Sequence, residues 1–442
     1  MLTRRIISVA ICVTLVSLVV GAYIPYSILK PSLDDAIKTQ SELKSRLAVV
    51  ETPEYKIGVI YPWSGRQSWW SADAKPILQD AESDIEAMLY NLRSNATISF
   101  LVEDSNSTGE GAIAAAKRLK DAGVDIIVGV PTSGELEAIM DYTREAGLTI
   151  ISSSSTSSAL SKPDNIFRIS TPENYRAKIA AEYAVKLGYD RVVVLYRNFD
   201  WGILWANTVV NVFEENNLEA YTIPFQLSHP GYMNYTETVR SAEKLVKDNR
   251  TLIFLVAWEN EDYSILIEAQ RSQILSGTRW FTASMYPSII NESLVEGRIH
   301  DIRDYAMKVG LLAPEQRPIA SDLTLRLLED AKQSLGRYPS YEHLYLYDAL
   351  MLAARTLLFT NGETQKLPDL IPSIASTYYG ATGWKKLNDN GDLTVEDTAF
   401  IGVSQSTGGY ELSYYAYHDG VRGEFLTLPE PKPRIWFFSP EA

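Results

Sequence analysis

Short apolar runs alternate with amphipathic segments along the first third of the chain. Each apolar run predicts a strand, and each segment with apolar residues three or four positions apart predicts a helix. The predicted strands span 55–61, 98–103, 124–128 and 148–151, and the predicted helices span 74–92, 111–122 and 135–146. This alternation predicts a parallel sheet that is covered by helices on both faces.

The same pattern then repeats with new segments. Further strands are predicted at 191–196, 220–224, 252–257 and 280–282, with helices at 173–187, 203–216, 235–247 and 261–273. The chain has 442 residues, whereas a single hydrophobic core rarely grows past roughly 250–300 residues. We therefore expect two α/β lobes with a ligand between them.

The N-terminal part of the chain has a different pattern. Residues 6–29 form an uncharged run behind two arginines, long enough to span a bilayer. The positive flank predicts that the N-terminus stays inside and that the rest of the chain lies outside. We expect residues 1–30 to form a signal anchor or transmembrane segment, with cleavage of a signal peptide near Ala22 as the alternative. Residues 31–53 are expected to form a helical spacer.

Composition narrows the classes of function. The formal net charge is −14, which argues against a nucleic-acid partner because phosphate contacts need clustered Lys and Arg. The only cysteine, Cys12, lies in the N-terminal apolar run, so no disulfide and no thiol nucleophile is expected in the folded body. The four histidines are scattered, without the spacing of metal ligands. We expect no cofactor, no metal and no catalytic residues.

A stretch of seven consecutive hydroxyl residues, Ser152 to Ser158, directly follows the apolar run 148–151. A strand that ends in small hydroxyl side chains offers side-chain donors and approachable backbone N–H groups at one point. In open α/β sheets, ligands bind outside the carboxyl ends of the strands. The stretch is therefore a candidate binding loop; a solvated serine-rich loop is the alternative interpretation.

Short motifs occur in a characteristic order over most of the chain. They are I-G-V-x-x-P-x-S-G (57–65), V-x-D (102–104), G-V-D-x-I-V-G (123–129), S-T-S-x-A-L-S (155–161), F-R (167–168), D-W-G (200–202), G-A-T-G-W (380–384) and N-D-N-G-D (388–392). From about Tyr55 to about Leu426 the chain resembles the type I periplasmic binding proteins, in particular the branched-chain amino-acid (Leu/Ile/Val) binding family that shares the receptor ligand-binding region. The resemblance implies an α/β fold with two Rossmann-like lobes, parallel sheets flanked by helices, and three crossovers between the lobes.

The resemblance also implies where the chain changes lobe. It assigns 54–171 and 288–379 to lobe 1, and 172–287 and 380–428 to lobe 2. The crossings are then expected near 170–173, 284–288 and 379–383. Residues 429–442 are expected to form a C-terminal strap.

The same resemblance implies which residues bind the ligand. In the first lobe it implies hydroxyl, backbone and aromatic contacts from Ser133, Gly134, Ser154, Ser155, Thr156 and Trp70. In the second lobe, Trp201 is expected to cover the ligand as an aromatic lid. Ser284 is also expected to bind the ligand, at the position where amino-acid binders of this family usually have an acidic residue; Glu259 or Glu261 could substitute for that acid.

Together these features predict an extracytoplasmic solute-binding protein of an ABC-type transporter, anchored at the outer face of the cell membrane or secreted. It would bind a small polar ligand (an amino acid, an amide or a related compound) by hinge closure and deliver it to a permease. The alternative is a membrane-tethered ligand-sensing ectodomain that works with a separate signalling chain. An enzyme is disfavoured, because no nucleophile–histidine–acid set occurs at the predicted strand ends.

Overall fold

The computed structural model describes residues 30, 35, 37–39, 52–226, 235–285, 302–316, 321–360 and 362–433. It divides into two compact units, Met1–Pro53 and Glu54–Ala442. In the first unit, the described residues 30, 35 and 37–39 are helical. The apolar run expected to be an anchor, and most of the expected spacer, lie outside the described residues. Among the helices that the structure describes, none is long and apolar enough to cross a membrane.

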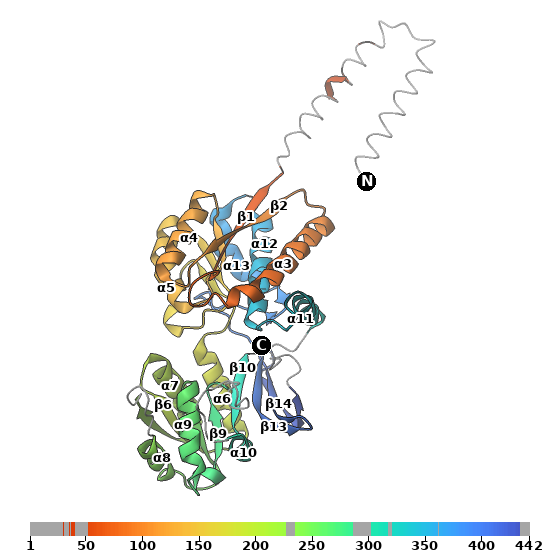
Figure 1. Cartoon of the computed structure of the whole chain (residues 1–442). Coiled ribbons are helices and arrows are strands. Elements are labelled where there is room, and N and C mark those ends of the chain that lie inside the picture. Colours follow the sequence, from red (N-terminus) through yellow and green to blue (C-terminus); the bar gives the residue numbers. More distant parts are fainter. Residues whose placement is uncertain are drawn as a thin grey trace. The chain divides into compact units, whose positions relative to one another are not determined.

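The second unit begins with a five-stranded parallel sheet, in the order β2-β1-β3-β4-β5 (Figure 1). Its strands are β1 (Glu54–Tyr61), β2 (Thr97–Asp104), β3 (Ile126–Gly129), β4 (Thr149–Ser152) and β5 (Ile166–Arg168), and the helices between them are α3 (Trp70–Leu92), α4 (Gly109–Asp121) and α5 (Ser133–Ala146). Ile126 and Val128 of β3 face one core, whereas Ile127 faces another. This two-residue alternation buries the strand on both faces, as expected for a parallel sheet.

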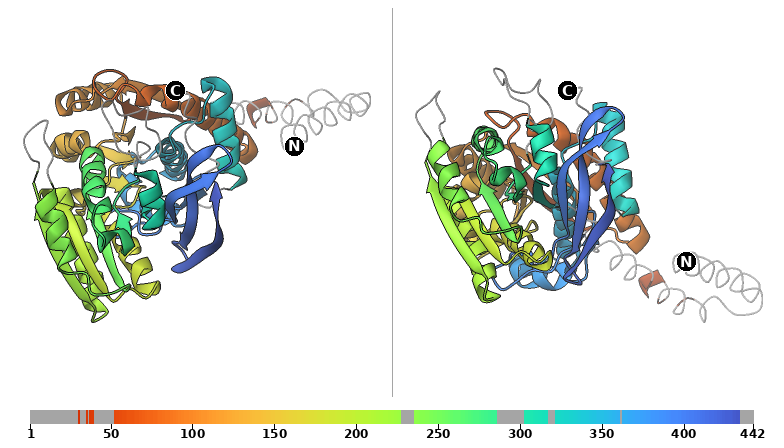
Figure 2. Two further views of the ribbon diagram at one scale, coloured as in Figure 1. Left: turned by 60° about the horizontal axis from the view of Figure 1, so that its bottom comes forward. Right: turned by 90° about the horizontal axis from the view of Figure 1, so that it is seen from below.

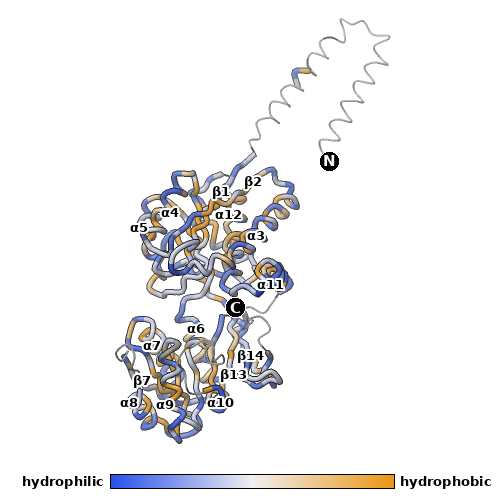
Figure 3. Tube along the Cα trace, viewed as in Figure 1, coloured by the Kyte–Doolittle hydropathy of each residue, from blue (hydrophilic) through white to orange (hydrophobic). Residues whose placement is uncertain are grey.

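Three later helices complete this first lobe, which comprises residues 54–168 and 321–394. They are α11 (Asp322–Leu335), α12 (Glu342–Thr360) and α13 (Leu367–Ala375). Helix α12 shares a core with β1, β3 and α3. Its side chains are buried almost all round, which is typical of a helix whose apolar residues are not confined to one stripe. Hydrophobic positions accordingly concentrate on β1 and α12 in Figure 3.

The second lobe, residues 173–316 and 398–433, is built on an eight-stranded sheet in the order β15-β14-β13-β10-β9-β8-β6-β7. Its parallel strands are β6 (Arg191–Arg197), β7 (Glu219–Phe225), β8 (Thr251–Val256), β9 (Arg279–Thr282) and β10 (Leu312–Gln316). Its helices are α6 (Glu173–Lys186), α7 (Asp200–Glu215), α8 (Thr236–Glu243), α9 (Glu259–Gln270) and α10 (Arg303–Lys308). Together the two sheets confirm the predicted α/β class with helices flanking parallel strands.

Three antiparallel strands extend one edge of the second sheet, next to β10 (Figure 2). They are β13 (Thr398–Ser406), β14 (Gly409–Asp419) and β15 (Glu424–Pro433). The expected C-terminal strap is therefore wrong for residues 429–433, because Lys432 and Pro433 pair with β14 in this sheet. Residues 434–442 lie outside the described part of the chain.

The predicted crossings between the lobes near 284–288 and 379–383 are also wrong, because each occurs later in the chain. Residues 302–316 still belong to the second lobe, because β10 pairs with β9 and β13 and Tyr305 lies in that lobe's core. Residues 388–393 still belong to the first lobe, because the backbone N–H of Arg168 donates to Gly391 O and that of Leu393 donates to Arg168 O. The later changes of lobe thus follow Gln316 and Leu393, rather than occurring near 284–288 and 379–383.

Candidate functional site

The hydroxyl loop, residues 152–158, is joined to the loop that follows β3. The Ser152 hydroxyl donates to Val130 O at 3.1 Å, and the Ser154 hydroxyl donates to Pro131 O at 3.2 Å. The hydroxyls of Ser133 and Ser155 lie 3.0 Å apart. Neighbouring parallel strands place their carboxyl ends at one sheet edge, so residues more than 20 positions apart meet here. The structure therefore brings together three of the predicted site residues, namely Ser133, Ser154 and Ser155.

The turn between β3 and α5 has an unusual backbone. Val130 has φ of +43°, a conformation that a β-branched residue rarely adopts and that is often found at functional sites. Gly129 before it must lack a side chain, since a Cβ there would lie 2.4 Å from Ile60 O. The reversal exposes the start of α5, where a Cβ on Gly134 would meet nothing within 4 Å. Gly134 is exposed at this helix start, whereas the Glu135 N–H next to it is capped by Thr132 Oγ1.

A buried carboxylate that sequence reasoning missed supports the same turn. Glu135, in the first turn of α5, accepts hydrogen bonds from Ser105 Oγ at 2.5 Å and from Thr132 Oγ1 at 2.6 Å. Its negative charge is favourable at a helix N-terminus, and it ties the loops after β2 and β3 to each other. The sequence signal was the pattern Thr-x-x-Glu at the helix start, which is typical of a capping box.

Arg168, at the end of β5, holds the hydroxyl loop in place through a hydrogen bond to its backbone. Its Nε donates to Asp392 Oδ1 at 2.6 Å, and its Nη1 donates to Ser157 O at 2.5 Å. Both charged side chains are only 1% exposed, so this is a buried ion pair. Gly391 is required beside it, because a Cβ there would approach Ile166 O to 2.7 Å. The F-R and N-D-N-G-D motifs, 220 residues apart, thus meet in one structural contact.

Thr156 links the hydroxyl loop to the second lobe. Its Oγ1 donates to Glu173 Oε1 at 3.4 Å, and its carbonyl oxygen accepts from the Glu173 N–H at 2.9 Å. Glu173 begins α6 and also accepts from Arg176 Nη2 at 2.6 Å and from Trp205 Nε1 at 3.0 Å. Trp205 in turn lies against Trp201, with ring centroids 6.0 Å apart. The Glu173 carboxylate and the Trp205 ring thereby connect two predicted site residues from different lobes, Thr156 and Trp201.

An aromatic group surrounds Trp201 at the carboxyl ends of β6 and β8. Phe199 lies 6.0 Å from Trp201 and 5.2 Å from Trp258, centroid to centroid. The guanidinium of Arg197 sits 3.8 Å from the Trp258 ring centroid and 4.8 Å from that of Phe199, which is cation–π geometry. Sequence reasoning missed Arg197 and Trp258, although each follows a predicted strand.

Glu261, one of the two acids considered as a substitute at the Ser284 position, already has partners. Its Oε1 lies 3.3 Å from Arg197 Nη1, and its Oε2 accepts from the Trp258 N–H at 2.9 Å. Burial raises the pKa of its carboxyl, while the Trp258 N–H and the Arg197 charge act in the opposite direction. Its charge is therefore engaged within the protein. The side chain of Glu259 lies outside the described part of the chain.

Two predicted site residues do not join this arrangement. Trp70, at the start of α3, is half-buried against the first-lobe core. Its ring meets His343 edge-on at 6.3 Å, and its carbonyl oxygen lies 2.9 Å from His343 Nε2. Ser284, just after β9, is half-buried and accepts at its carbonyl from Thr282 Oγ1 at 3.3 Å. No described contact connects either residue to the hydroxyl loop.

Residues from the segments that connect the two lobes form hydrogen bonds with Glu396. Its carboxylate accepts hydrogen bonds from Thr171 of the first connection, from Tyr345 of α12, and from Gln316 Nε2 of β10 at 2.8 Å. Its carbonyl oxygen accepts from Tyr175 of α6 at 2.9 Å. Burial raises the pKa of the Glu396 carboxyl, an effect opposed by the hydrogen bonds from Thr171 and Tyr345. A change in the angle between the lobes would have to rearrange this node.

Comparison with known proteins gives a consistent result. A family model described as the receptor family ligand binding region matches residues 78–404. The uncharacterized protein MJ1266 of Methanocaldococcus jannaschii is 22% identical over 387 residues, which cover 80% of this chain and 90% of that protein.

Solved structures resemble the fold over nearly their whole length. A leucine binding protein LivK from Thermotoga maritima has a TM-score of 0.57 at 18% identity, covering 83% of this chain and 99% of its own. An ABC transporter substrate-binding protein from Desulfitobacterium hafniense in complex with Leu has a TM-score of 0.60 at 18% identity, covering 81% and 99%. A solute binding protein from Rhodopseudomonas palustris in complex with 3,4-dihydroxy benzoic acid has a TM-score of 0.57 at 15% identity, covering 83% and 98%.

Proposed function

The chain belongs to the receptor family ligand binding region family, and on that premise we propose that it is an extracytoplasmic solute-binding protein of an ABC-type transporter. The resemblance to type I periplasmic binding proteins that the sequence predicted is confirmed at the level of family and fold. Family and fold neighbours are ligand-binding or transport proteins rather than enzymes. We propose accordingly that this chain binds a ligand without chemical conversion.

One observation carries the proposal: the link from Thr156 through Glu173 to Trp205 and Trp201. It joins a hydroxyl-rich loop of the first lobe to an aromatic group of the second. A ligand held between hydrogen-bond donors on one lobe and ring faces on the other gains contacts only when the lobes approach each other. Differential contact of this kind drives hinge closure, and Glu396 is the node at which such a hinge would turn.

The ligand proposed here is a small polar compound that carries a carboxylate or an amide. The hydroxyls of Ser133 and Ser155 share one hydrogen bond and therefore keep one O–H that suits an acceptor group on the ligand. The acid that usually pairs a ligand ammonium is replaced by Ser284, and Glu261 is already paired with Arg197. The bound ligands named for two neighbours, Leu and 3,4-dihydroxy benzoic acid, share a carboxylate but not an ammonium. Because Glu261 is paired with Arg197 and Ser284 carries no charge, we expect a ligand that has a carboxylate or an amide but no ammonium group.

Delivery to a membrane permease and tethering through residues 1–30 complete the proposal. The apolar run behind two arginines supports an anchor, with secretion after cleavage as the alternative. A ligand-sensing ectodomain remains the second candidate, since the family model itself describes a receptor region. Co-purification of the full chain from its native membrane distinguishes the two: a transporter predicts a permease partner, and a sensor predicts a signalling chain.

Ligand-dependent unfolding tests the proposal directly. The full chain is heated in the presence of amino acids, amides, aromatic acids and short carboxylates. A ligand that binds only the folded state stabilises it by about 2.7 kcal/mol at a hundredfold excess over its dissociation constant. We expect Thr156→Ala and Trp201→Ala to abolish the shift, and Tyr90→Ala, which alters a ring 83% exposed on α3, to leave it unchanged. No shift with any compound, or equal shifts in all variants, would contradict the proposal.

A further inference from the structure

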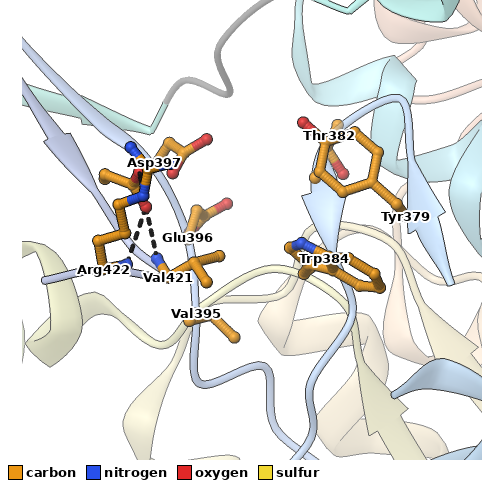
Figure 4. A pocket seen from close by; sticks show the side chains of 10 residues that line it. Tyr379, Thr382, Trp384, Val395, Glu396, Asp397, Val421 and Arg422 are labelled. Carbon is orange, nitrogen blue, oxygen red and sulfur yellow. Dashed lines mark hydrogen bonds and ion pairs between the residues drawn. The ribbon is translucent and has the colours of Figure 1, made fainter. Parts of the chain in front are cut away.

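A cavity of about 300 Å³ lies away from the residues discussed so far, apart from Glu396 at its base (Figure 4). It is lined by three segments: the hairpin of β11 (Tyr379–Gly380) and β12 (Gly383–Trp384), the connection 395–397, and the turn 419–422 between β14 and β15. None of the predicted ligand-binding residues is among its lining. Its volume is at the lower end of the range for small-molecule sites.

One wall of the cavity is aromatic. The rings of Tyr379 and Trp384 meet edge to face, with centroids 5.3 Å apart and planes at 81°. They are 45% and 39% exposed, although burying a large ring is favourable. The faces of such rings attract cations, Trp most strongly.

A buried cage holds this wall in place. Asp348 of α12 accepts hydrogen bonds from the Ala381 N–H at 2.7 Å and from the Thr382 N–H at 2.8 Å, and it lies 3.1 Å from Lys385 Nζ. Gly380 is required here, because a Cβ would lie 2.1 Å from Asp348 Oδ1. The hairpin is therefore fixed before any ligand arrives, which reduces the entropy lost on binding.

The opposite side of the cavity is acidic. Asp397 Oδ1 accepts from the Gly420 N–H at 2.9 Å, and Asp419 Oδ1 accepts from the Val421 and Arg422 N–H groups at 2.9 Å. Among the described residues that line the cavity, three are acids, Glu396 included, and one is a base, Arg422, whose side chain is 74% exposed and paired with Asp419 at 3.7 Å. The negative field reaches the aromatic wall: the pKa of Tyr379 is raised by burial first, and further by the charges of Asp397 and Asp419.

We propose that this cavity is a second small-molecule site, which binds an organic cation such as a quaternary ammonium group between the Tyr379–Trp384 rings and Asp397. Ring faces and a carboxylate on facing walls are complementary to a bulky, weakly hydrated positive charge. An anion would meet the acids, and a neutral compound would gain only the apolar contact. Because the hairpin belongs to the first lobe and the turn 419–422 to the second, a bound cation also favours one separation of the two walls. By linkage, its occupancy then changes the affinity of the cleft ligand.

Calorimetric titration of the full chain with choline tests this site, with 3,3-dimethylbutan-1-ol as the neutral compound of the same shape. We expect choline to bind and the neutral alcohol to bind at least about tenfold more weakly, since only the charged compound gains the attraction of the ring faces and the carboxylate. Trp384→Leu should weaken choline binding by about tenfold. Asp397→Asn should weaken it by a smaller factor that disappears as salt is raised.

Matched variants separate this site from the cleft. Tyr90→Leu removes an exposed ring on α3, and Asp141→Asn removes an exposed acid on α5; both should bind choline as the unaltered chain does. Trp201→Ala should also leave choline binding intact. Three outcomes overturn the proposal: no heat with choline, equal binding of choline and the alcohol, or loss of choline binding in Trp201→Ala but not in Trp384→Leu. The last would mean that choline occupies the cleft, so a failure of this site is distinguishable from a failure of the proposed function.

Discussion

Each lobe is stabilised internally by a different kind of contact. In the first lobe, the inner helix α12 carries Asp348, paired with Lys385, and both side chains are fully buried. In the second lobe, α6 is held to its sheet by rings: Tyr183 lies 4.2 Å from Phe400 and 6.1 Å from Phe281, centroid to centroid. Removing one partner of a buried ion pair leaves the other charge buried and unpaired, which is strongly destabilising. In a cluster of rings the stabilisation comes from the buried area of all the rings together.

The same difference recurs at the candidate site. The first lobe presents hydroxyls that are already hydrogen-bonded to neighbouring loops, such as Ser154 to Pro131 and Ser133 to Ser155. The second lobe presents exposed ring surface, with Trp258 49% exposed. The hydroxyls of the first lobe are therefore fixed in place and form directional hydrogen bonds, whereas the rings of the second lobe tolerate ligands of different shape. A ligand's polar end is then recognised by the first lobe and its remaining surface by the second.

The largest difference between the lobes is expected from removing the buried acid. Asp348→Ala leaves Lys385 without its counter-ion and two backbone N–H groups without their acceptor, which should cost about 3–5 kcal/mol of unfolding free energy. Asp141→Ala, which removes an acid paired with Arg144 at the surface, should cost less than about 1 kcal/mol.

Hydrogen exchange across a urea titration locates this loss, because it reports each lobe separately. We expect peptides of the first lobe to lose protection first in Asp348→Ala, with the second lobe following only when the whole chain unfolds. A loss confined to the second lobe would contradict the assignment of the cage to the first.

A smaller effect is expected from trimming the ring cluster. Phe281→Leu keeps an apolar side chain among Tyr183, Phe400 and Phe254 but leaves unfilled volume, and should cost about 1–2 kcal/mol. The control is Phe359→Leu, since Phe359 is 70% exposed on α12. The same exchange measurement should place the loss in the second lobe; a cost equal to that of Phe359→Leu would show that the cluster contributes no packing.

The sequence predicted the parts of this comparison that arise locally. The alternation of strands and helices in residues 55–282 follows from periodicity within each segment, and the structure contains those elements. Strands β10 and β13–β15 were not predicted, because pairs such as Leu312 with Gly402 depend on contacts across 90 residues. The only sequence signal for the Asp348 cage was one acid within an apolar helix, which indicates a buried partner but not its identity.

The candidate site shows the same limit. Hydroxyls after a strand could be recognised from the sequence, whereas Arg197 and Trp258 come together only because β6 and β8 are neighbours in the sheet. A tryptophan after a strand is equally typical of a core position, so its exposure could not be predicted. The resemblance supplied Trp201 but not the rings around it.

The pH dependence of the second lobe sharpens the comparison further. His418 of β14 is buried against Phe425, with ring centroids 4.7 Å apart, and burial lowers its pKa from 6.5 to about 4, against the opposing charge of Asp419. The unfolded chain therefore takes up a proton between pH 6.5 and 4 that the folded chain does not. Stability from this residue is complete above pH 6.5 and is lost as the pH falls toward 4.

Replacing the histidine tests this directly. His418→Gln should remove part of the fall in Tm on acidification from pH 7 to pH 4.5, a change of a few degrees for a chain of this size. The comparison is made within each protein across pH, so that any constant cost of the substitution cancels. An unchanged slope of Tm against pH would contradict a buried neutral histidine.

The smallest expected effect has the opposite sign and lies in the first lobe. Asp80 of α3 is half-buried, and its pKa is raised to about 6 by burial first and by the negative charge of Asp330, with Arg326 acting against them. The folded chain here keeps a proton that the unfolded chain releases near pH 4. Stability is therefore fully present below pH 4 and is lost as the pH rises through 6.

Asp80→Asn should accordingly raise Tm at pH 7, slightly because the group is partly exposed to solvent, and should change nothing at pH 4. Glu82→Gln, two positions along α3 and exposed, is the matched control and should have no such pH-dependent effect. If both expectations hold, acid favours the first lobe at Asp80 and disfavours the second at His418, so lowering the pH from 7 to 4.5 should change which lobe loses hydrogen-exchange protection first. The same order of unfolding at both pH values, in the unaltered chain and in both variants, would show that the lobes do not respond separately.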